Sequence, residues 1–467
     1  MPNTRPNLLL LIPDQHRWDF GPWDPQSPLR MPNLASLAER GVQFDQAIVN
    51  SPLCAPMRAS LASARSYGSC GVVDNGNDYP IDLPTFYQQL RSAGYQVCGT
   101  GKFDLHKVSG GWGLDGQNGL ADWGFTQGID NEGKWDGFRN FRDTGAAQGP
   151  YYRFLVENDL AEAHCQDFER RGRDYSDGRD YGSTFPTTLP DFAYGDNWIG
   201  RNTIDILRDL PQGQPWFMQV NFTGPHEPQD ITASMWHSCQ GVGYPGPLAS
   251  TQHDAEFHNR ARQNYGAMLE NIDARIGEII AAVERRGELD NTVIVYTSDH
   301  GDKLGDHDEW QKSRPWQSSV AVPLIAAGPG VAQGRSSSAL IQMFDLAATF
   351  IDYADADPVP EMDSQSLRPV LEDPARAHRE ILFSGLRYHG GYTSVAASRE
   401  PKHYVWDLAF DGRFKLIHQH GLGLSPQLFD LESDPAESND LAAADPDRTS
   451  ALLELIHAET ARNGISV

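Results

Sequence analysis

The chain has 467 residues and is strongly acidic, with 63 Asp and Glu against 38 Lys and Arg and a formal charge of −25. This balance argues against nucleic acid or an anionic membrane surface as the main partner, because both bind basic protein faces. Hydrophobic residues make up 39% of the chain, which excludes a disordered protein. No apolar run approaches the ~20 residues of a membrane helix. Because the chain is so acidic, a sulfate or phosphate substrate would need a locally positive site.

The amino-terminal segment and the cysteines bear on the cellular compartment. The first fifteen residues, MPNTRPNLLLLIPDQ, lack a small-residue cleavage site and lead directly into a predicted strand, so we expect no signal peptide. The five cysteines are odd in number and contain no CxxC pair, which predicts neither a zinc site nor a disulfide framework. We expect a cytoplasmic protein, or a periplasmic one if a leader has been removed.

Strand and helix patterns alternate through the first two thirds of the chain. The predicted strands cover residues 7–12, 42–49, 95–99, 217–222, 292–297 and 322–326. The predicted helices cover residues 33–39, 83–93, 258–286 and 341–351. Repeated strand–helix units predict an α/β fold with a large, mainly parallel sheet sandwiched by helices. We assign this part, residues 1–360, to a catalytic domain.

Two segments depart from the alternating pattern. Residues 109–196 are rich in Gly, Asp, Arg and aromatic residues and predict an insertion of loops and short elements over the site. Residues 361–467 follow a Pro- and Asp-rich connector and predict a small C-terminal α+β domain. Its expected strands cover residues 379–383, 404–408, 414–418 and 427–431, with a helix from about 447. This pattern indicates a small antiparallel sheet with one packed helix.

Polar and reactive residues follow five of the predicted strands. In chain order they are Asp14 with Gln15, Cys54 to Arg58, Lys102 to His106, His226, and Asp299 with His300. Functional sites of parallel sheets gather in the loops beyond the carboxyl ends of the strands. We therefore expect these five loops to converge on one site.

The most specific motif is Cys54-Ala55-Pro56-Met57-Arg58, followed by a helical pattern through Arg65. It resembles the C-x-P-x-R signature of the type I sulfatase family, with Ala64-Arg65 where the family usually ends in Gly-Arg. The resemblance implies that a formylglycine-generating enzyme converts Cys54 to formylglycine. One hydroxyl of the hydrated aldehyde would attack sulfur and the other would later expel sulfate, while Arg58 steadies the hydrate. Taken alone, the motif also fits a buried thiol at a helix start.

The resemblance also implies a metal site. Carried over by position, Asp14, Gln15, the Cys54-derived group, Asp299 and His300 would coordinate one divalent cation. Oxygen donors suit Ca²⁺, Mg²⁺ or Mn²⁺; we expect Ca²⁺ first, with the imidazole of His300 tilting the choice toward Mn²⁺. Taken singly, Asp14 fits a turn residue and Asp299-His300 a polar turn.

Further family blocks supply candidate groups for binding and proton transfer. Lys102 resembles the family lysine that grips a sulfate oxygen, and Lys312 resembles a second one. His226, in a P-H-x-P block, is the candidate general acid that protonates the leaving oxygen, or a hydrogen-bond donor to sulfate. A pKa near neutrality suits this task. His106 lies two residues beyond the usual family histidine, where Asp104 stands instead, so it is either catalytic or structural. Together with Arg58 and a metal, these cations would form the positive site that an anionic ester requires.

Residues 427–431 and the following DPAESNDLA also resemble the family's C-terminal segment, so the likeness spans nearly the whole chain. The expected function is hydrolysis of a small-molecule or carbohydrate sulfate ester. The alternative is a phosphodiester or phosphonate monoester hydrolase that uses the same site. A catalytically silent binding protein is a third reading, disfavoured because no expected metal or nucleophile position carries an inert residue. The sequence leaves the oligomeric state open, and an oligomer is compatible with it.

Overall fold

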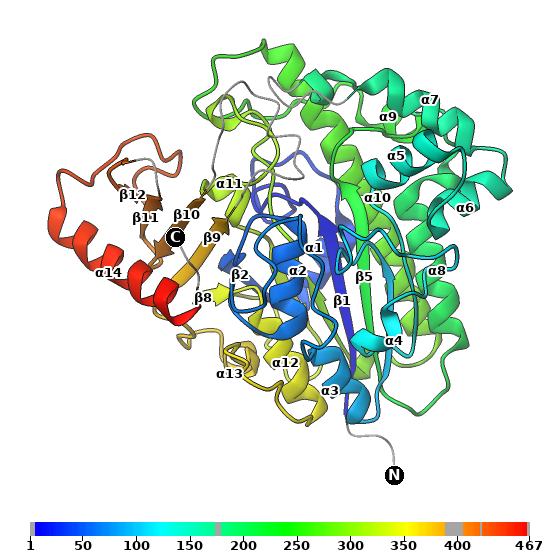
Figure 1. Ribbon diagram of the computed structural model, residues 1–467, viewed down its shortest axis with the longest axis horizontal. Helices are drawn as coiled ribbons and strands as arrows, with labels where there is room; N and C mark the ends of the chain where they lie inside the picture. The colour runs from blue at the N-terminus through cyan, green and yellow to red at the C-terminus, as the bar shows by residue number, and fades with distance from the viewer. Residues whose placement is uncertain (1–4, 173–178, 388–404, 421–422, 465–467) are drawn as a thin grey trace.

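The computed structural model describes residues 5–172, 179–387, 405–420 and 423–464, and its main body is built on one eight-stranded sheet (Figure 1). The strands are β1 (Asn7–Asp14), β2 (Gly41–Ile48), β3 (Gln96–Gly101), β4 (Gln127–Asp130), β5 (Trp216–Pro225), β6 (Thr292–Tyr296), β7 (Leu324–Ala327) and β8 (Arg335–Gln342). Their order is β4-β3-β5-β1-β6-β7-β2-β8. Only β7 among these strands runs antiparallel to its neighbours. The predicted α/β class with a mainly parallel sheet is confirmed.

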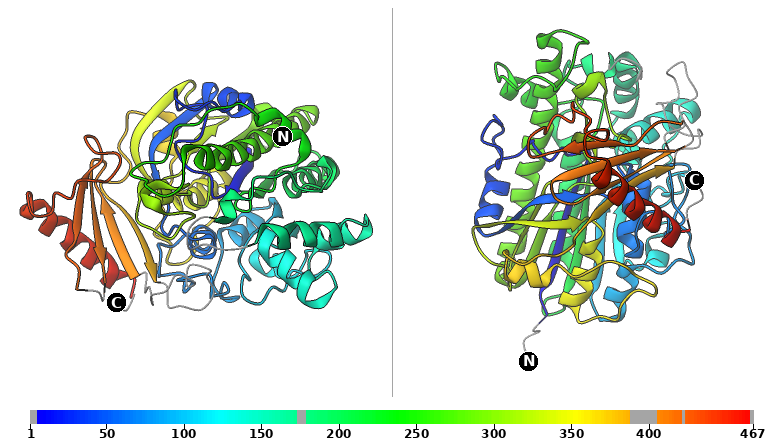
Figure 2. Two further views of the ribbon diagram at one scale, coloured as in Figure 1. Left: turned by 90° about the horizontal axis from the view of Figure 1, so that it is seen from above. Right: turned by 90° about the vertical axis from the view of Figure 1, so that its left-hand side faces the viewer.

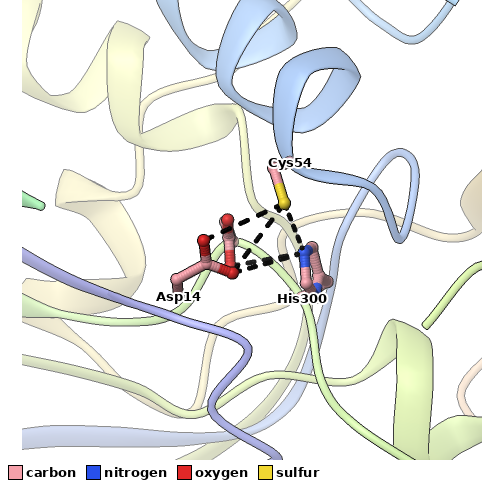
Figure 3. Close-up of side chains that lie close together, drawn as sticks. Asp14, Cys54 and His300 are labelled. Atoms are coloured by element: carbon pink, nitrogen blue, oxygen red, sulfur yellow. Dashed lines mark hydrogen bonds and ion pairs between the residues drawn. The ribbon is translucent and has the colours of Figure 1, made fainter. Parts of the chain in front are cut away.

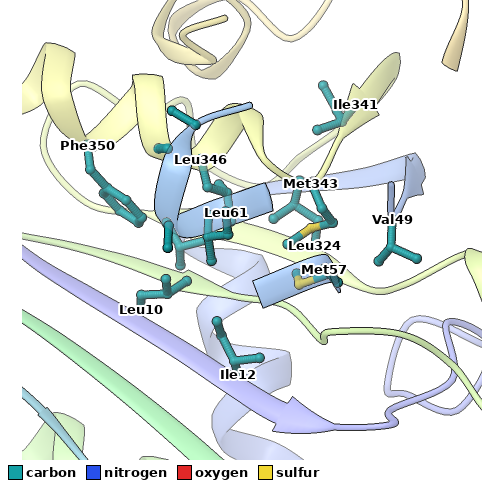
Figure 4. Packing of buried hydrophobic residues seen from close by; sticks show 14 of the residues in the cluster. Leu10, Ile12, Val49, Met57, Leu61, Leu324, Ile341, Met343, Leu346 and Phe350 are labelled. Carbon is teal, nitrogen blue, oxygen red and sulfur yellow. The ribbon is translucent and has the colours of Figure 1, made fainter. Parts of the chain in front are cut away.

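Helices cover both faces of this sheet, and side chains of the central strand β1 pack into the hydrophobic core on each face. On one side lie α2 (Cys54–Ser63), α3 (Phe86–Ser92) and α12 (Asp345–Ala354); on the other lie α1 (Pro32–Glu39), α8 (Gly195–Asp209) and α10 (Ala255–Arg285). Leu10 and Ile12 of β1 enter the first core, as Figure 4 shows, whereas Leu9 and Leu11 enter the second. The continuous apolar run of β1 is explained by burial on both faces.

One expectation for the main body was wrong in detail, and one strand was not predicted. The predicted helix over 341–351 begins inside β8, and the actual helix α12 starts at Asp345. Strand β8 escaped prediction because its first half, Arg335 to Ser338, is polar and mostly exposed, as befits a strand at the edge of the sheet beside β2.

The insertion is more regular than the expected loops and short elements. It contains α4 (Leu120–Trp123), β4, α5 (Lys134–Thr144), α6 (Pro150–Glu157) and α7 (Ala161–Arg171). Strand β4 extends the main sheet beside β3. Aromatic side chains of the helices, including Trp135, Phe138 and Phe168, pack edge to face and join the second core, so local packing stabilises these helices.

The C-terminal part forms the predicted small antiparallel sheet with one packed helix. Its strands are β9 (Leu382–Arg387), β10 (Val405–Phe410), β11 (Phe414–Gln419) and β12 (Gln427–Asp430), in the order β12-β11-β10-β9, and its helix is α14 (Pro446–Arg462). Figure 2 shows this sheet, in orange to red, to one side of the main body. The first residue of the expected strand over 404–408, Tyr404, lies outside the described residues.

Shorter elements complete the described chain. They are the helices α9 (Ala233–Cys239), α11 (Gln317–Val320) and α13 (Arg368–Glu372), with 3₁₀ turns at 179–182, 191–193, 289–291 and 306–308. Within the part of the chain that the structure describes, no helix combines the length and apolarity needed to cross a bilayer.

Candidate active site

The carboxyl ends of the central strands bring four potential metal ligands together. Asp14 closes β1, Cys54 begins α2 just beyond β2, and Asp299 and His300 follow β6. One ligand atom from each residue lies within 4.8 Å of the others, and all four residues are buried. Asp14, Cys54 and His300 point toward one another (Figure 3). The expected convergence of distant loops therefore holds for these residues.

Cys54 occupies the centre of this cluster. Its Sγ lies 3.1 Å from Nε2 of His300 and 3.8 and 3.9 Å from the two carboxylate oxygens of Asp14. Burial, reinforced by the charge of Asp14, raises the pKa of the Cys54 thiol to about 11. The unmodified side chain is therefore protonated at neutral pH, a state in which a thiol is a weak nucleophile.

Two buried cations bind the carboxylates of the cluster. Both Nε and Nη2 of Arg58 donate to Oδ2 of Asp299, at 3.1 and 2.8 Å. Lys102 Nζ forms an ion pair with Asp14 and lies 3.0 Å from Oδ2 of Asp104. Burial raises the pKa of Asp14, but the neighbouring positive groups, Lys102 foremost, together outweigh it and hold that pKa well below its usual range. Asp14 is thus a carboxylate able to bind a cation.

Gln15 links this cluster to a second layer of polar groups. Its backbone N–H donates to Oδ1 of Asp299 at 2.9 Å, and its side-chain Nε2 donates to Asp302, Tyr181 and Glu227. Its Oε1, the atom able to bind a metal, accepts a hydrogen bond of 2.7 Å from Lys312 Nζ. The structure thereby brings Gln15 and Lys312 to the same site.

A narrow cleft of about 60 Å³ opens above the cluster. Asp14, Cys54, Lys102, His226 and Lys312 are part of its lining. Trp135, one of the tryptophans of the insertion, also lines the cleft. Sequence reasoning missed several of its other lining residues, namely Asn75, Lys107, Lys134, Asp136 and Arg139. Most of these come from the insertion, where nothing in the local sequence marks them; only Lys107, just after the Lys102 block, stood near a recognised motif.

His226 enters the cleft with one ring nitrogen already engaged. Its Nδ1 lies 2.7 Å from the main-chain oxygen of Glu227 and 3.1 Å from the Oε2 of the same residue. Burial, together with the positive charge of Lys312, holds the pKa of His226 well below its usual range, whereas the expected role suited a value near neutrality. Ordinary solvent exposure would have left the pKa nearer neutrality.

His106 is held away from the lining of this cleft. Its Nε2 lies 2.8 Å from Oδ2 of Asp130, and its ring meets Trp112 and Trp123 edge to face, with centroids 5.8 and 5.1 Å away. This environment matches the structural alternative for His106, because the ring packs against two tryptophans and its Nε2 lies next to one carboxylate. Asp104 lies between Lys102 and Lys107, with Oδ1 3.0 Å from Lys107 Nζ.

Comparison with known protein families gives the site its context. The family model described as "Sulfatase" matches residues 6–356. This chain belongs to the sulfatase family. A model for the C-terminal region of N-sulphoglucosamine sulphohydrolase matches residues 305–461, so the sulfatase likeness extends through the small sheet.

Two curated sulfatases are similar to this sulfatase over nearly its whole length. A choline-sulfatase of Rhizobium meliloti (strain 1021) is 28% identical over 95% of this chain and 83% of its own length. An N-acetylglucosamine-6-O-sulfatase of Bacteroides thetaiotaomicron is 25% identical over 94% of this chain and 82% of its own length.

Solved structures share the fold. A protein in complex with its substrate D-glucosamine-2-N,6-O-disulfate superposes with a TM-score of 0.76 at 20% identity, over 99% of this chain and 98% of that protein. The phosphonate monoester hydrolase of Agrobacterium radiobacter superposes with a TM-score of 0.81 at 21% identity, over 98% and 96% of the two chains. At these identities the likeness establishes the alkaline phosphatase-like sulfatase fold.

Proposed function

We propose that this sulfatase-family chain hydrolyses a small-molecule or carbohydrate sulfate ester with a formylglycine nucleophile derived from Cys54. The observation that carries the proposal is the position of Cys54, at the amino terminus of α2 and within 3.9 Å of both Asp14 and His300. A helix amino terminus favours an anion at this point. The protonated thiol is a poor nucleophile as it stands, so conversion to a hydrated aldehyde would supply the reactive oxygen.

The residues present fit a divalent cation. Its ligands would be Asp14, Asp299, His300, the Oε1 of Gln15 and the group derived from Cys54. The two carboxylates offer the oxygen donors that Ca²⁺, Mn²⁺ and Mg²⁺ prefer. Such a cation supplies charge that offsets the buried carboxylates and lowers the pKa of a bound hydroxyl. Arg58 fixes the orientation of Asp299 through its paired N–H groups.

The chain's own cations would bind the sulfate group. Lys102 and Lys312 both line the cleft next to Cys54 and are placed to donate to the non-bridging sulfate oxygens. Charge grows on these oxygens and on the leaving oxygen during displacement, where fixed donors contribute most. His226, once the anionic ester has favoured its imidazolium form, would protonate the leaving oxygen through Nε2, because Nδ1 faces Glu227.

The substrate class follows from the relatives and from the cleft. The choline-sulfatase and the N-acetylglucosamine-6-O-sulfatase are named for small sulfated molecules, and a cleft of about 60 Å³ fits the reacting group of such a molecule. The alternative, hydrolysis of a phosphodiester or phosphonate monoester, is supported by the fold shared with the phosphonate monoester hydrolase. We propose the formylglycine-generating enzyme as a maturation partner and the cytoplasm as the compartment.

Mass spectrometry and paired kinetics test this function. In protein co-expressed with a formylglycine-generating enzyme, the peptide containing Cys54 should carry the aldehyde or its hydrate. Cys54→Ala should lose turnover of an aryl sulfate, whereas Cys165→Ala, which removes a buried thiol in α7, should retain it. A higher kcat/KM for a phosphonate monoester than for the matched sulfate would favour the alternative, and wild-type turnover by Cys54→Ala would refute the nucleophile.

A further inference from the structure

A buried carboxylate lies directly behind the candidate acid His226. Glu227 is 1% exposed, and its Oε2 lies 3.1 Å from Nδ1 of His226. The same Oε2 accepts a hydrogen bond of 3.2 Å from Nε2 of Gln15, while Oε1 accepts one of 3.1 Å from Nε2 of Gln311. Hydrogen bonds from Gln15 and Gln311 thus hold the carboxylate in its position next to the imidazole.

These contacts determine which nitrogen of His226 carries a proton. Nδ1 faces two oxygen acceptors, the main-chain oxygen and Oε2 of Glu227, so it must be the protonated nitrogen of the neutral ring. Nε2 is then the nitrogen left for the cleft, which His226 lines. A ring flipped about its Cβ–Cγ bond would place a carbon against both oxygens, and would lose the hydrogen bond to the main chain and the contact with Oε2.

The backbone of the same loop is held by a different residue. Lys134 of α5 donates to the main-chain oxygens of His226 and Pro228 at 2.9 and 3.2 Å, and to Oδ1 of Asp230 at 2.6 Å. None of these bonds reaches the imidazole. Orientation of the ring about its side-chain torsions is therefore left to Glu227.

We infer that Glu227 is a positioning residue that aims Nε2 of His226 at the leaving oxygen of the ester. The inference rests on the proposed function and deepens it. The bound ester is an anion and favours the imidazolium form of His226, in which a proton from solvent occupies Nε2 as well as Nδ1. As the bond between sulfur and the leaving oxygen breaks, its electron pair stays on that oxygen, which takes the proton from Nε2. The ring keeps its Nδ1 proton, bonded to Glu227, so the imidazole ends neutral and in one tautomer.

Leaving-group dependence separates positioning of the acid from general damage. An aryl sulfate has a weakly basic leaving group that needs little protonation, whereas an alkyl sulfate releases a strongly basic alkoxide that needs it fully. In Glu227→Gln, kcat/KM for the alkyl ester should fall about tenfold to a hundredfold further than kcat/KM for the aryl ester. Glu132→Gln, which alters another buried acid that contacts Tyr151 and Tyr152 instead, should keep the wild-type ratio. Equal losses on both esters in Glu227→Gln would overturn the inference.

A double variant and the metal content sharpen the test. If Glu227 acts through the ring, Glu227→Gln should cost nothing further once His226→Ala is present; an undiminished cost there would contradict the inference. Because Glu227 also touches Gln15, bound metal is measured in parallel. Unchanged metal stoichiometry supports action through His226, and loss of metal in Glu227→Gln overturns it.

A measurement without turnover keeps this inference separate from the proposed function. Nitrogen-15 NMR of histidine-labelled protein should show the neutral ring of His226 with its proton on Nδ1 in the wild type. In Glu227→Ala, where the main-chain acceptor remains and Oε2 is gone, the tautomer with the proton on Nε2 should gain population. A neutral wild-type ring with its proton on Nε2 would overturn the role of Glu227. Failure of the wild type to cleave any sulfate ester, with the Nδ1 tautomer intact, would instead refute the proposed reaction.

Discussion

Buried charges at the base of the cleft occur in contacting pairs of opposite sign. Arg58 binds Asp299 and Lys102 binds Asp14, and all four residues are at most 3% exposed. Removing one member of such a pair leaves the other charge buried without a partner. The resulting loss of stability is far larger than the stability that an exposed ion pair contributes. At this scale, catalysis and stability depend on the same side chains.

Arg58→Ala should therefore lower both stability and activity. It leaves Asp299 unpaired, and we expect a loss of about 3–5 kcal/mol in the free energy of unfolding, together with loss of sulfate ester hydrolysis. Urea unfolding monitored by fluorescence measures the first effect. The matched control is Arg153→Ala, whose side chain and partner Glu157 are both about half exposed and which should cost less than about 1 kcal/mol. Similar losses in both variants would show that the buried pair is not special.

Glu132 should give the protein a pH-dependent stability of defined sign. Burial outweighs the hydrogen bonds from Tyr152 and Tyr151 and raises the pKa of Glu132 to about 7. Between the usual carboxylate pKa and 7, the folded state keeps a proton that the unfolded state has released. The free energy of unfolding therefore falls as pH rises through this window, by about 3 kcal/mol.

Glu132→Gln removes this titrating group. Relative to the wild type, the variant should gain stability between pH 4.5 and pH 7.5, as measured by urea unfolding across that range. Parallel stability profiles for the two proteins would contradict the predicted pKa shift.

Helix boundaries follow capping contacts more closely than apolar periodicity. Periodicity placed a helix over 83–93, but α3 begins at Phe86 because Thr85 caps it. Thr85 Oγ1 accepts from the N–H of Gln88, the Gln88 side chain accepts from the N–H of Thr85, and the Thr85 hydroxyl donates to the main chain of Trp123. This capping box also joins α3 to α4.

Thr85→Ala should destabilise the protein through this helix start. The variant loses the cap and the donor to Trp123 in a buried position, so we expect a cost of about 1–2 kcal/mol, measured by chemical denaturation. Thr188→Ala, at an exposed threonine, is the control and should stay within about 0.5 kcal/mol of the wild type. A cost for Thr85→Ala as small as that of the control would argue against the capping box.

One face of the small C-terminal sheet packs into the first core of the main body, whereas its other face forms a separate cluster with α14. Trp406, Leu408 and Phe410 of β10 belong to the same cluster as α2 and α12. Trp406 Nε1 donates to the main-chain oxygen of Ser313 at 3.3 Å, next to Lys312. Lys415 of β11 donates to the main-chain oxygen of Pro315 at 2.8 Å. The C-terminal sheet thereby supports the loop that carries a candidate sulfate-binding lysine.

Unfolding should accordingly be cooperative across the whole molecule. Calorimetry of the full chain should show a single transition, because neither part can be exposed without opening the shared core. A chain ending at residue 360 would expose the apolar surface that β9 and β10 cover, so we expect it to aggregate instead of folding. Two separate transitions, or a soluble folded fragment over 1–360, would show that the predicted domain boundary is a folding boundary.

The sequence by itself determined the features that local pattern encodes. The apolar run of β1, the strand–helix alternation and the motifs around Asp14, Cys54 and Asp299 predicted the sheet and the buried cluster, because residues at strand ends must meet at one edge of a parallel sheet. Only the tertiary structure decided the remainder: Lys107 and Lys134 in the cleft, His106 outside its lining, and Glu227 behind His226. Lys134 reaches the loop after β5 from the insertion, and Glu227 is held by Gln15 and Gln311. Contacts between such distant segments leave no periodicity or spacing in the sequence.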